Sequence, residues 1–441
     1  MKGFTFNKQF MVLMFLLLNC FASYAADENL ITKQITLNLT EAGTLPNKIA
    51  SSRKNLVTNL KLIGEINGTD LRYLREMAGC YVKGENGKLS KLDLSEARIV
   101  EGGDYYYDDG ATYYRTSNDI MGACAFTDCK SLTSIKLPSS ITRIDTLAFS
   151  SCPLTSVNIP SNVIEIRSGA FWGCESLTSV NIPSSVKEIG ESAFVYCKSL
   201  TSINIPSSVT EIGEDAFRGC KSLTSVNIPS SVKEIGEYAF NGCKSLTSVN
   251  IPSSVTMIEY WTFSSCTSLK SVNISLGVTG IRDYAFYDCT SLTSVNIPSS
   301  VFWIGDNAFS CCTSLASIKI PSSIEFIKSE AFCGCKSLKS IYVFAEDVPS
   351  TDKRAFDGCD SKNCVVYVPK GTYDEYRASG FGYFENIFEF DATTSIHDTV
   401  ATPEVKEIAR YAVNGQRLTA PIKGINLVKY SDGTVKKEFV K

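Results

Sequence analysis

A motif of about 23 residues is repeated along most of this chain, and it restricts the possible folds more than any other feature. One copy begins at Leu223 and runs Leu-Thr-Ser-Val-Asn-Ile-Pro-Ser-Ser-Val-Lys-Glu-Ile-Gly-Glu-Tyr-Ala-Phe-Asn-Gly-Cys. Its phenylalanine recurs from Phe126 to Phe356 in steps of 23 residues, apart from one step of 22 and one of 24. A fixed period of this length is typical of solenoids, whose repeats bury a continuous core by stacking. We therefore expect one elongated array instead of several globular domains.

Each repeat is expected to form one turn that contains two short strands. From Leu223 to Ile228 the first, fourth and sixth residues are apolar, so they can face the core while the polar residues face solvent. The following proline has no N–H to continue a ladder, and the Ser-Ser pair suits a turn. Val-x-x-Ile-Gly predicts a second extended segment, and Ala-Phe-x-x-Cys predicts an inward-facing return. About ten such repeats would form a solenoid of short parallel β-strands spaced by about 4.8 Å.

The spacing Leu-x-x-Val-x-Ile with this period matches a leucine-rich repeat. The full motif, Leu-Thr-Ser-Val-Asn-Ile-Pro-Ser-Ser-Val-x-x-Ile-Gly-x-x-Ala-Phe-x-x-Cys-x-Ser, resembles the BspA-like leucine-rich repeats, a family of bacterial surface proteins that is also expanded in some parasitic protists. The resemblance covers about residues 56–391. It implies a surface protein of the Bacteroidetes type, an adhesin that binds host matrix proteins or other cells. This implication comes from the family and not from the periodicity.

The N-terminus has the pattern of a secretory signal peptide. Lys2 and Lys8 precede an apolar run, and small residues before Ala25 suit signal-peptidase cleavage, so residues 1–25 are expected to be removed. Lipid attachment at Cys20 is the alternative, although the preceding asparagine fits it poorly. No later segment offers the roughly 20 consecutive apolar residues of a transmembrane helix. We expect a secreted or cell-surface protein whose mature chain has no transmembrane segment.

Residues 26–118 are expected to form an N-terminal cap made of degenerate repeats and one short helix. The pattern over residues 69–77 predicts an amphipathic helix that starts at Thr69 or Asp70. Such a cap would cover the core and the unpaired strand groups at the end of the array. Within it, residues 101–116 form a Tyr- and Asp-rich insertion, for which the sequence leaves three roles open: binding a partner, binding a cation, or a solvated excursion.

The regular array is assigned to residues 119–345, and a C-terminal cap to residues 346–391, where a last strand, a short helix and an aromatic-rich cover are expected. A polar linker over 392–403 follows, and residues 404–441 form a β-rich tail. Two hairpins are expected in this tail because Asn-Gly and Asp-Gly pairs separate its apolar segments. The tail resembles the C-terminal sorting domains of the type IX secretion pathway, although it is shorter than they usually are.

Charge and composition argue against several classes of function. The chain has 43 basic and 46 acidic residues and a net charge of −3, whereas nucleic-acid binding requires a basic stripe. The single histidine, His397, lies in the linker, so no Ser-His-Asp triad and no histidine metal site is expected in the array. The column of Glu188, Glu211 and Glu234 could in principle supply paired catalytic carboxylates, but we interpret it as a solvated face. We expect no enzyme and no cofactor.

Eleven of the 17 cysteines occupy one position of the repeat. Residues related by translation along a solenoid keep their Cβ atoms about 4.8 Å apart, whereas a disulfide requires about 3.8 Å. We therefore expect buried free thiols in this structural ladder. The best disulfide candidates lie off the ladder, Cys311 with Cys333 and, more weakly, Cys80 with Cys124. The ladder consists of Cys129, Cys152, Cys174, Cys197, Cys220, Cys243, Cys266, Cys289, Cys312, Cys335 and Cys359.

The candidate partner-binding residues are aromatic side chains at positions that are polar in other repeats. The outward strand positions are monotonous, with an asparagine in most repeats, so they carry little information about a partner. Large apolar side chains at outward positions indicate a binding patch, unless they pack on one another and simply extend the core. The candidates are Tyr238, Tyr260, Trp261, Tyr284, Tyr287, Phe302, Trp303 and Phe326.

Two functional hypotheses remain open at this stage. The first is a secreted or cell-surface adhesin-type protein that binds host matrix or other cell-surface proteins through the repeat scaffold. The second is a structural envelope protein that associates with itself and has no host ligand, in agreement with the near-identity of the repeats. The first hypothesis predicts a monomer that adheres to matrix proteins, whereas the second predicts a chain that associates with itself and adheres to none.

Overall fold

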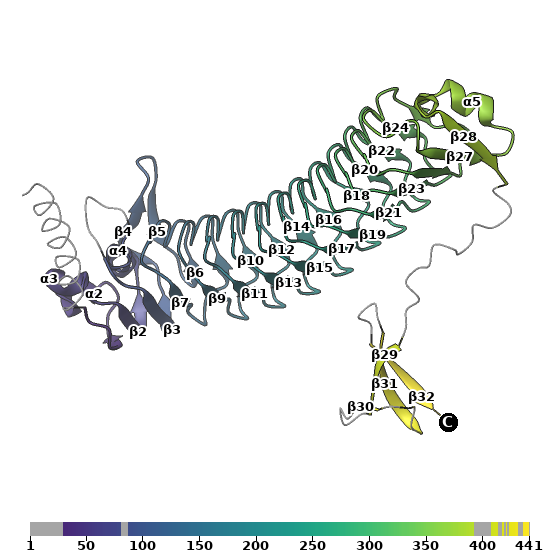
Figure 1. Cartoon of the computed structure of the whole chain (residues 1–441). Helices are drawn as coiled ribbons and strands as arrows, with labels where there is room; N and C mark the ends of the chain where they lie inside the picture. The colour runs from purple at the N-terminus through teal and green to yellow at the C-terminus, as the bar shows by residue number, and fades with distance from the viewer. Residues whose placement is uncertain are drawn as a thin grey trace, which may run out of the picture. The chain divides into compact units, whose positions relative to one another are not determined.

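The computed structural model describes residues 30–80 and 87–391, and within the tail residues 407–412, 417–418, 420, 423–430 and 435–440. The chain divides into two units, one up to Glu389 and one from Phe390, which are described separately. The first unit is a parallel β-solenoid whose successive turns lie side by side (Figure 1). The predicted leucine-rich repeat fold is thus confirmed.

Two sheets, built from the first strand of each turn, follow one another along the solenoid. Neighbouring strands are parallel from β1 to β15 and from β17 to β27. The eight-stranded sheet contains β1 (Ile35–Leu39), β2 (Asn59–Ile66), β3 (Lys91–Ile99), β7 (Ser134–Lys136), β9 (Ser156–Asn158), β11 (Ser179–Asn181), β13 (Ser202–Asn204) and β15 (Ser225–Asn227). The seven-stranded sheet contains β17 (Ser248–Ile251), β19 (Ser271–Ile274), β21 (Ser294–Asn296), β23 (Ser317–Ile320), β25 (Ser340–Val343), β27 (Val365–Pro369) and β28 (Asn386–Phe390).

The number of turns exceeds the ten repeats that the motif predicts. Eight strands in one sheet and seven in the other give fifteen first strands. The difference arises because segments of both caps, whose sequences depart from the motif, continue the same stack. In most regular turns the strand alternates as predicted: Val180 and Ile182 are buried, whereas Ser179 and Asn181 are exposed.

The second strand of each turn has only two residues and forms a parallel column of its own. This column is also divided, into a six-stranded and a five-stranded sheet. The first contains β6 (Ile120–Met121), β8 (Arg143–Ile144), β10 (Glu165–Ile166), β12 (Glu188–Ile189), β14 (Glu211–Ile212) and β16 (Glu234–Ile235). The second contains β18 (Met257–Ile258), β20 (Gly280–Ile281), β22 (Trp303–Ile304), β24 (Phe326–Ile327) and β26 (Ser350–Thr351).

Both strand columns are interrupted at the same boundary between two turns. β15 and β17 belong to different sheets, and so do β16 and β18. The return segment nevertheless continues across the boundary, because the Tyr238 N–H donates to the Tyr260 carbonyl at 3.0 Å and the Phe240 N–H to the Thr262 carbonyl at 2.9 Å. Beside the first strands, the Thr247 N–H also donates to the Thr224 carbonyl at 3.2 Å. The two halves of the array are therefore joined here by backbone hydrogen bonds and by the core.

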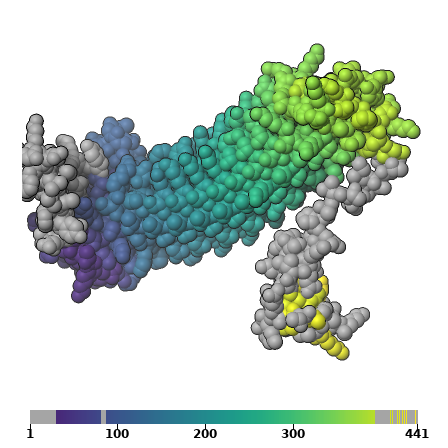
Figure 2. All heavy atoms as spheres, in the orientation of Figure 1, coloured from purple at the N-terminus to yellow at the C-terminus, as the bar shows by residue number. Residues whose placement is uncertain are grey.

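A column of eleven phenylalanines runs through the core from Phe126 to Phe356. All eleven side chains are fully buried. Adjacent rings are stacked with centroids 5.1 to 5.8 Å apart and planes within 13° of parallel. This spacing lies within the range of favourable aromatic contacts. In the space-filling view the turns form one continuous surface over this core (Figure 2).

The described residues of the N-terminal cap, 30–80 and 87–118, include the helices α2 (Leu45–Lys48), α3 (Ser51–Lys54) and α4 (Gly68–Met77). The helix predicted to start at Thr69 or Asp70 instead has its N-cap at Asn67. The Asn67 side chain accepts from the Thr69 N–H at 3.0 Å, and the Asp70 carboxylate accepts from the Asn67 N–H at 3.0 Å. This reciprocal arrangement is a capping box, in which Asp70 serves as the third helical residue. The start was misplaced because both residues are good N-caps.

The Tyr- and Asp-rich insertion is a β-hairpin and not an irregular loop. It consists of the antiparallel strands β4 (Gly102–Asp108) and β5 (Tyr113–Thr116), which form a two-stranded sheet. The hairpin projects from the solenoid beside α4 (Figure 1). It is separate from the two sheet columns of the array.

The C-terminal end of the solenoid is covered by α5 (Tyr373–Ala378) and the 3₁₀ helix η1 (Gly380–Tyr383). Tyr376 is fully buried and its hydroxyl donates to the Ala345 carbonyl at 2.6 Å. The rings of Phe381 and Phe384 lie 5.3 and 5.1 Å from that of Phe356, so they close the end of the phenylalanine column. The expected order of strand, short helix and aromatic cover is found over residues 365–390.

The tail unit contains a four-stranded antiparallel sheet in the order β30-β29-β31-β32. The predicted turn residues between these strands and the predicted linker lie outside the described residues, as does the predicted signal peptide. Within the part of the chain that the structure describes, no helix combines the length and apolarity needed to cross a bilayer. The tail strands are β29 (Glu407–Ala412), β30 (Arg417–Leu418), β31 (Gly424–Tyr430) and β32 (Val435–Val440).

Candidate partner-binding site

The eight aromatic residues singled out in the sequence fall into two groups according to the side chains that they contact. Tyr238, Trp261, Tyr284 and Tyr287 lie on the return segments and are called the return-segment group. Trp303 and Phe326 lie on second strands β22 and β24. Phe302 directly precedes β22, and Tyr260 is linked to Trp303 through a shared arginine; these four are the second-strand group.

The backbone constrains the return-segment group. The residue two positions before the phenylalanine has a positive φ in every turn from Phe126 to Phe332, including φ of 56° at Tyr238, 58° at Trp261 and 60° at Tyr284. Left-handed backbone favours glycine and asparagine over bulky residues. The scaffold therefore does not require aromatic side chains at these three positions.

The rings of the return-segment group stack on one another along the array. Trp261 lies 4.0 Å from Tyr284 and 5.9 Å from Tyr238, with planes within 7° of parallel. Tyr287 packs against both Trp261 and Tyr284 at 5.9 and 5.7 Å, and the Arg218 guanidinium covers the free face of Tyr238 at 5.3 Å. The ring faces are thus occupied within the protein, as the alternative of an extended core predicts. A partner would meet mainly ring edges here.

The second-strand group is built around Trp303 and Gly280. A Cβ at position 280 would lie 2.6 Å from the Trp303 indole and 2.9 Å from the Met257 sulfur. Because position 280 is glycine, the indole can lie across the neighbouring turn and approach Met257. Met257, Gly280, Trp303 and Phe326 are directly opposite one another in the parallel register.

Two cations surround the Trp303 ring. The Arg282 guanidinium lies 5.9 Å from the Trp303 centroid and 4.9 Å from that of Tyr260, and it donates to the Tyr260 hydroxyl at 3.0 Å. The Lys328 ammonium lies 5.2 Å from Trp303. Arg282 also pairs with Glu259 at 2.8 Å; burial raises the pKa of this glutamate, and the Arg282 charge opposes that shift. Tyr260 and Trp303 are therefore linked through their contacts with the same guanidinium, that of Arg282.

Phe302 and Phe326 are the most exposed members of either group. Their side chains are 46% and 50% exposed, whereas the other six aromatic residues are half-buried. The corresponding positions carry Lys233 and Glu234 in an earlier turn, so the turn itself does not need apolar side chains there. We define the second-strand patch by this pair and its cationic aromatic surroundings. It consists of Phe302, Trp303, Phe326, Tyr260, Arg282 and Lys328.

The glutamate column lies on the second strands of the first half of the array. Glu188, Glu211 and Glu234 are exposed and in register with one another. Burial and the two like-charged neighbours raise the pKa of Glu211. Glu188 also lines a surface hollow of 630 Å³ with Arg167 and Ile164. Within the described residues, no group of three or more His, Cys, Asp or Glu side chains is placed to hold a metal ion.

The cysteine ladder is buried, as predicted, but one member forms a disulfide. Cys129 is bonded to Cys80, which corrects the expected pairing of Cys80 with Cys124. The pairing differs because Cys80 follows α4 and lies next to the end of the ladder, and Cys124 remains a free buried thiol. Cys311 and Cys333, the other predicted pair, are free and half-buried. The ladder pattern hid the true partner because Cys129 occupies a regular ladder position.

The remaining ladder thiols bond to the backbone of the preceding turns. Each donates to a core phenylalanine carbonyl with sulfur to oxygen distances of 2.8 to 3.3 Å. Burial raises the pKa of Cys220 and Cys266 to about 12. Thiols held in the protonated form are poor nucleophiles, so these residues act as small core side chains.

Other exposed aromatic residues were not among the predicted candidates. Trp172 and Tyr196 are 39% and 37% exposed and meet edge to face at 6.2 Å, and Tyr113 on β5 is 62% exposed. Tyr196 occurs in a column that carries glycine in both neighbouring turns, and Trp172 in one that carries Ser150 and Val195. Comparison of every column, and not only of the two richest in aromatics, would have found them.

The family of the chain follows from its repeats. The model of the BspA type leucine rich repeat region matches in overlapping segments over residues 119–247, 187–316, 233–364 and 302–420. These segments cover more than half of the chain. The protein is a BspA-type leucine-rich repeat protein. Among curated protein sequences, none matches it.

Solved structures of leucine-rich repeat proteins resemble this BspA-type chain. A leucine-rich repeat protein from Bacteroides ovatus is 27% identical, with a TM-score of 0.52, and the match covers 76% of this chain and 85% of that one. A leucine-rich repeat protein of T. pallidum is 36% identical over 36% of this chain and 78% of its own, with a TM-score of 0.35. A leucine rich cell surface protein from Faecalibacterium prausnitzii is 28% identical, with a TM-score of 0.36, over 64% of this chain and 85% of that one.

Proposed function

We propose that this BspA-type protein is a secreted or cell-surface adhesin-type scaffold that binds host matrix or other cell-surface proteins without catalysis. The observation that carries the proposal is the exposure of Phe302 and Phe326 beside Trp303, at positions that are polar in most of the other turns. Exposed aromatic side chains next to arginine are enriched in the centres of protein interfaces. The proposed location rests on the signal-peptide pattern of residues 1–25 and on the family.

The second-strand patch fits a protein partner better than the return-segment group does. Phe302 and Phe326 have exposed ring surface that a partner can cover, whereas the rings of Tyr238, Trp261 and Tyr284 are stacked on one another. Burying a large exposed apolar side chain contributes about 1.5 to 3 kcal/mol. Two such residues are enough to dominate a small interface.

Adhesion of the mature chain to immobilised extracellular-matrix protein tests the proposal. The variant Phe302→Thr with Phe326→Glu introduces residues that other turns carry at these columns, so the fold should be retained. We expect its adhesion to fall at least about tenfold, which corresponds to 1.4 kcal/mol. The matched control is Trp172→Ala, which removes an exposed aromatic side chain from a different turn. This variant should adhere as the wild type does.

Two results would contradict this proposal. Equal adhesion of the wild type and the double variant would remove the second-strand patch as the binding surface. A wild-type chain that associates with itself and adheres to no matrix protein would instead favour the structural envelope role. Sedimentation analysis of both proteins separates these outcomes, because it reports the oligomeric state independently of adhesion.

We also propose that residues 404–441 are a type IX secretion sorting signal joined by a linker over 392–403. The four-stranded antiparallel sheet of the tail unit and its resemblance to such domains support this role. Deleting residues 404–441 should leave the protein inside the producing cell, in fractions that also contain periplasmic markers. Normal surface display of the truncated protein would show that the tail is dispensable for export.

A further inference from the structure

The β4–β5 hairpin is held rigidly at its base. Tyr106 is buried, and its hydroxyl donates to the Ala123 carbonyl at 2.7 Å. The Asp104 N–H donates to the Thr69 hydroxyl at 3.0 Å, and Gly68 lies so close that a Cβ there would overlap the Asp104 carbonyl. The hairpin is therefore fixed to the first turn of α4.

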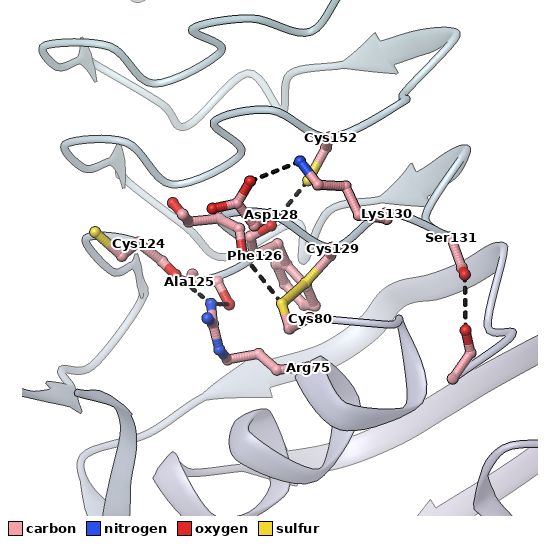
Figure 3. The surroundings of a disulfide bond; sticks show 12 residues. Arg75, Cys80, Cys124, Ala125, Phe126, Asp128, Cys129, Lys130, Ser131 and Cys152 are labelled. Atoms are coloured by element: carbon pink, nitrogen blue, oxygen red, sulfur yellow. Dashed lines mark hydrogen bonds and ion pairs between the residues drawn. A yellow bond between two sulfur atoms is a disulfide. The ribbon is translucent and has the colours of Figure 1, made fainter. Parts of the chain in front are cut away.

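Helix α4 is in turn fixed to the first regular turn of the array (Figure 3). The buried Arg75 guanidinium donates to the Cys124 carbonyl and, at 2.9 Å, to the Ala125 carbonyl. The Cys80–Cys129 disulfide joins the segment after α4 to the cysteine ladder. The Tyr107 ring of β4 covers Arg75 at 4.4 Å, so the hairpin shares this anchor.

The tip of the hairpin is also fixed, by its own carboxylates. Asp109 accepts from the N–H groups of Ala111 and Thr112 at 2.9 and 2.7 Å and from the Tyr114 hydroxyl at 2.9 Å. These bonds lower the pKa of Asp109. Asp108 accepts from the Gly110 N–H at 2.8 Å. A rigid projection of this kind loses little conformational entropy when it binds.

Within the part of the chain that the structure describes, Tyr113 and one edge of the hairpin are not covered by other elements. Tyr113 is 62% exposed and packs against Tyr105 at 4.8 Å, and the Arg72 guanidinium supports Tyr105 at 5.1 Å. Within the described residues, β5 pairs only with β4, so its other edge is unpaired. Unpaired strand edges can add an extended peptide as a further strand. Tyrosine is well suited to contact such a peptide because it offers large area at low entropy cost.

The charge of the hairpin indicates the chemistry of such a peptide. Residues 101–118 carry four carboxylates and one arginine, which gives a net charge of −3. Asp104 and Asp108 are exposed, and Asp108 lies directly opposite Tyr113 in the antiparallel register. Both carboxylates lie on β4, whereas the one arginine, Arg115, lies on β5. A lysine or arginine of an incoming strand would therefore reach over Tyr113 toward Asp108 to meet complementary charge.

We propose that the β4–β5 hairpin is a second binding element, which captures an extended lysine- or arginine-containing polypeptide segment along the free edge of β5. The main chain of that segment would bond to β5, its apolar side chains would cover Tyr113 and Tyr105, and its cations would reach across β5 toward the carboxylates of β4. This inference rests on the proposed function in taking the partner to be a protein. It assigns the hairpin a contact that the second-strand patch does not make.

Selection of a random-peptide phage library on the immobilised mature chain tests this inference. The affinity of each selected peptide is then measured for the wild type and for three variants. These are Tyr113→Ala, the triple variant that combines Glu101→Gln, Asp104→Asn and Asp108→Asn, and the control Trp172→Ala. The amides keep the oxygen that accepts from the Gly110 N–H, so the tip should stay folded. We expect a class of basic peptides whose affinity falls about tenfold in both hairpin variants and is unchanged in Trp172→Ala.

Binding by strand addition also requires backbone N–H groups in the selected peptides. A proline placed within a selected peptide removes an N–H that the ladder needs, so it should abolish binding where alanine at the same site does not. The inference is overturned if no selected peptide depends on Tyr113, if the dependent peptides are acidic or uncharged, or if proline is tolerated throughout. The variant that carries Phe302→Thr and Phe326→Glu should still bind the selected peptides even where it no longer adheres to matrix protein. Failure of one proposal can therefore be distinguished from failure of the other.

Discussion

Within the repeats, phenylalanine occurs in two environments, which are determined by its position in the motif. Phe240 belongs to the core column and is fully buried between the rings of Phe217 and Phe263. Phe302 lies at an outward position of the second strand and is 46% exposed. The same residue type therefore packs in the core at one column and is exposed to solvent at the other.

Replacing each of these residues by alanine should separate the two roles. Phe240→Ala leaves a cavity between two stacked rings and should lower the free energy of unfolding by about 3 to 5 kcal/mol. Phe302→Ala removes exposed surface only and should change it by less than about 0.5 kcal/mol. Urea unfolding followed by circular dichroism measures both. Comparable losses would mean that Phe302 contributes to the core.

Buried thiols give the array a dependence on alkaline pH. Burial raises the pKa of Cys220 from its ordinary value near 9 to about 12. Below about pH 9 the thiol is protonated in both states, so its stabilising contribution is complete. Between about pH 9 and pH 12 only the unfolded chain releases the proton, so each such thiol lowers the free energy of unfolding by about 1.4 kcal/mol per pH unit.

Substitution of one ladder thiol should therefore change the pH profile as well as the stability. Cys220→Ala removes one thiol that releases a proton on unfolding. Between about pH 9 and pH 12 the free energy of unfolding of this variant should therefore fall less steeply with pH than that of the wild type, by about 1.4 kcal/mol per pH unit. Urea unfolding at a series of pH values measures the slope. An unchanged slope would indicate that Cys220 already ionises in the folded protein.

At the residue scale, the fixed period predicts which column a residue occupies but not how its side chain packs. The step of 23 residues was enough to place Phe240 and Cys220 in the core. It left open whether Tyr238, Trp261 and Tyr284 face a partner or pack on one another, and the structure shows them stacked face to face. The period also could not show that Trp303 lies over Gly280, since that contact joins two turns.

At the scale of elements, the N-terminal cap and the array form one connected structure. The cap continues the first sheet through β1, β2 and β3, and α4 is fixed to the first regular turn by Arg75 and by the Cys80–Cys129 disulfide. Strand spacing predicts the continued sheet, because the apolar periodicity persists in the cap. The disulfide is a contact between a helix end and a ladder position, which periodicity does not encode.

Breaking this disulfide should loosen the cap more than the array. The bond closes a loop of 49 residues, for which chain entropy gives about 4 kcal/mol of stabilisation. Cys80→Ser should therefore allow proteolysis within residues 30–118 under conditions in which the array resists. Cys124→Ser, a nearby buried cysteine outside the bond, is the control. Equal resistance of the two variants would show that Arg75 and the sheet hold the cap without the bond.

At the scale of the whole solenoid, each turn contacts mainly its two neighbours, so turns of the same register are interchangeable in the scaffold. Thr201 precedes a first strand in the same way as Thr224, and Thr293 in the same way as Ala316. Removing residues 202–224 or residues 294–316 therefore deletes one complete turn and rejoins the motif in register. The two deletions cost similar buried area, but only the second removes Phe302 and Trp303.

Adhesion should distinguish the two shortened proteins although their stability does not. We expect both to fold with similar thermal midpoints, because neither deletion exposes an end of the core. The protein that lacks residues 202–224 should adhere to matrix protein as the wild type does, whereas the one that lacks residues 294–316 should lose at least about tenfold in affinity. If both lost adhesion equally, binding would depend on the length of the array, and function would belong to the uniform repeat instead of to the few turns that depart from it.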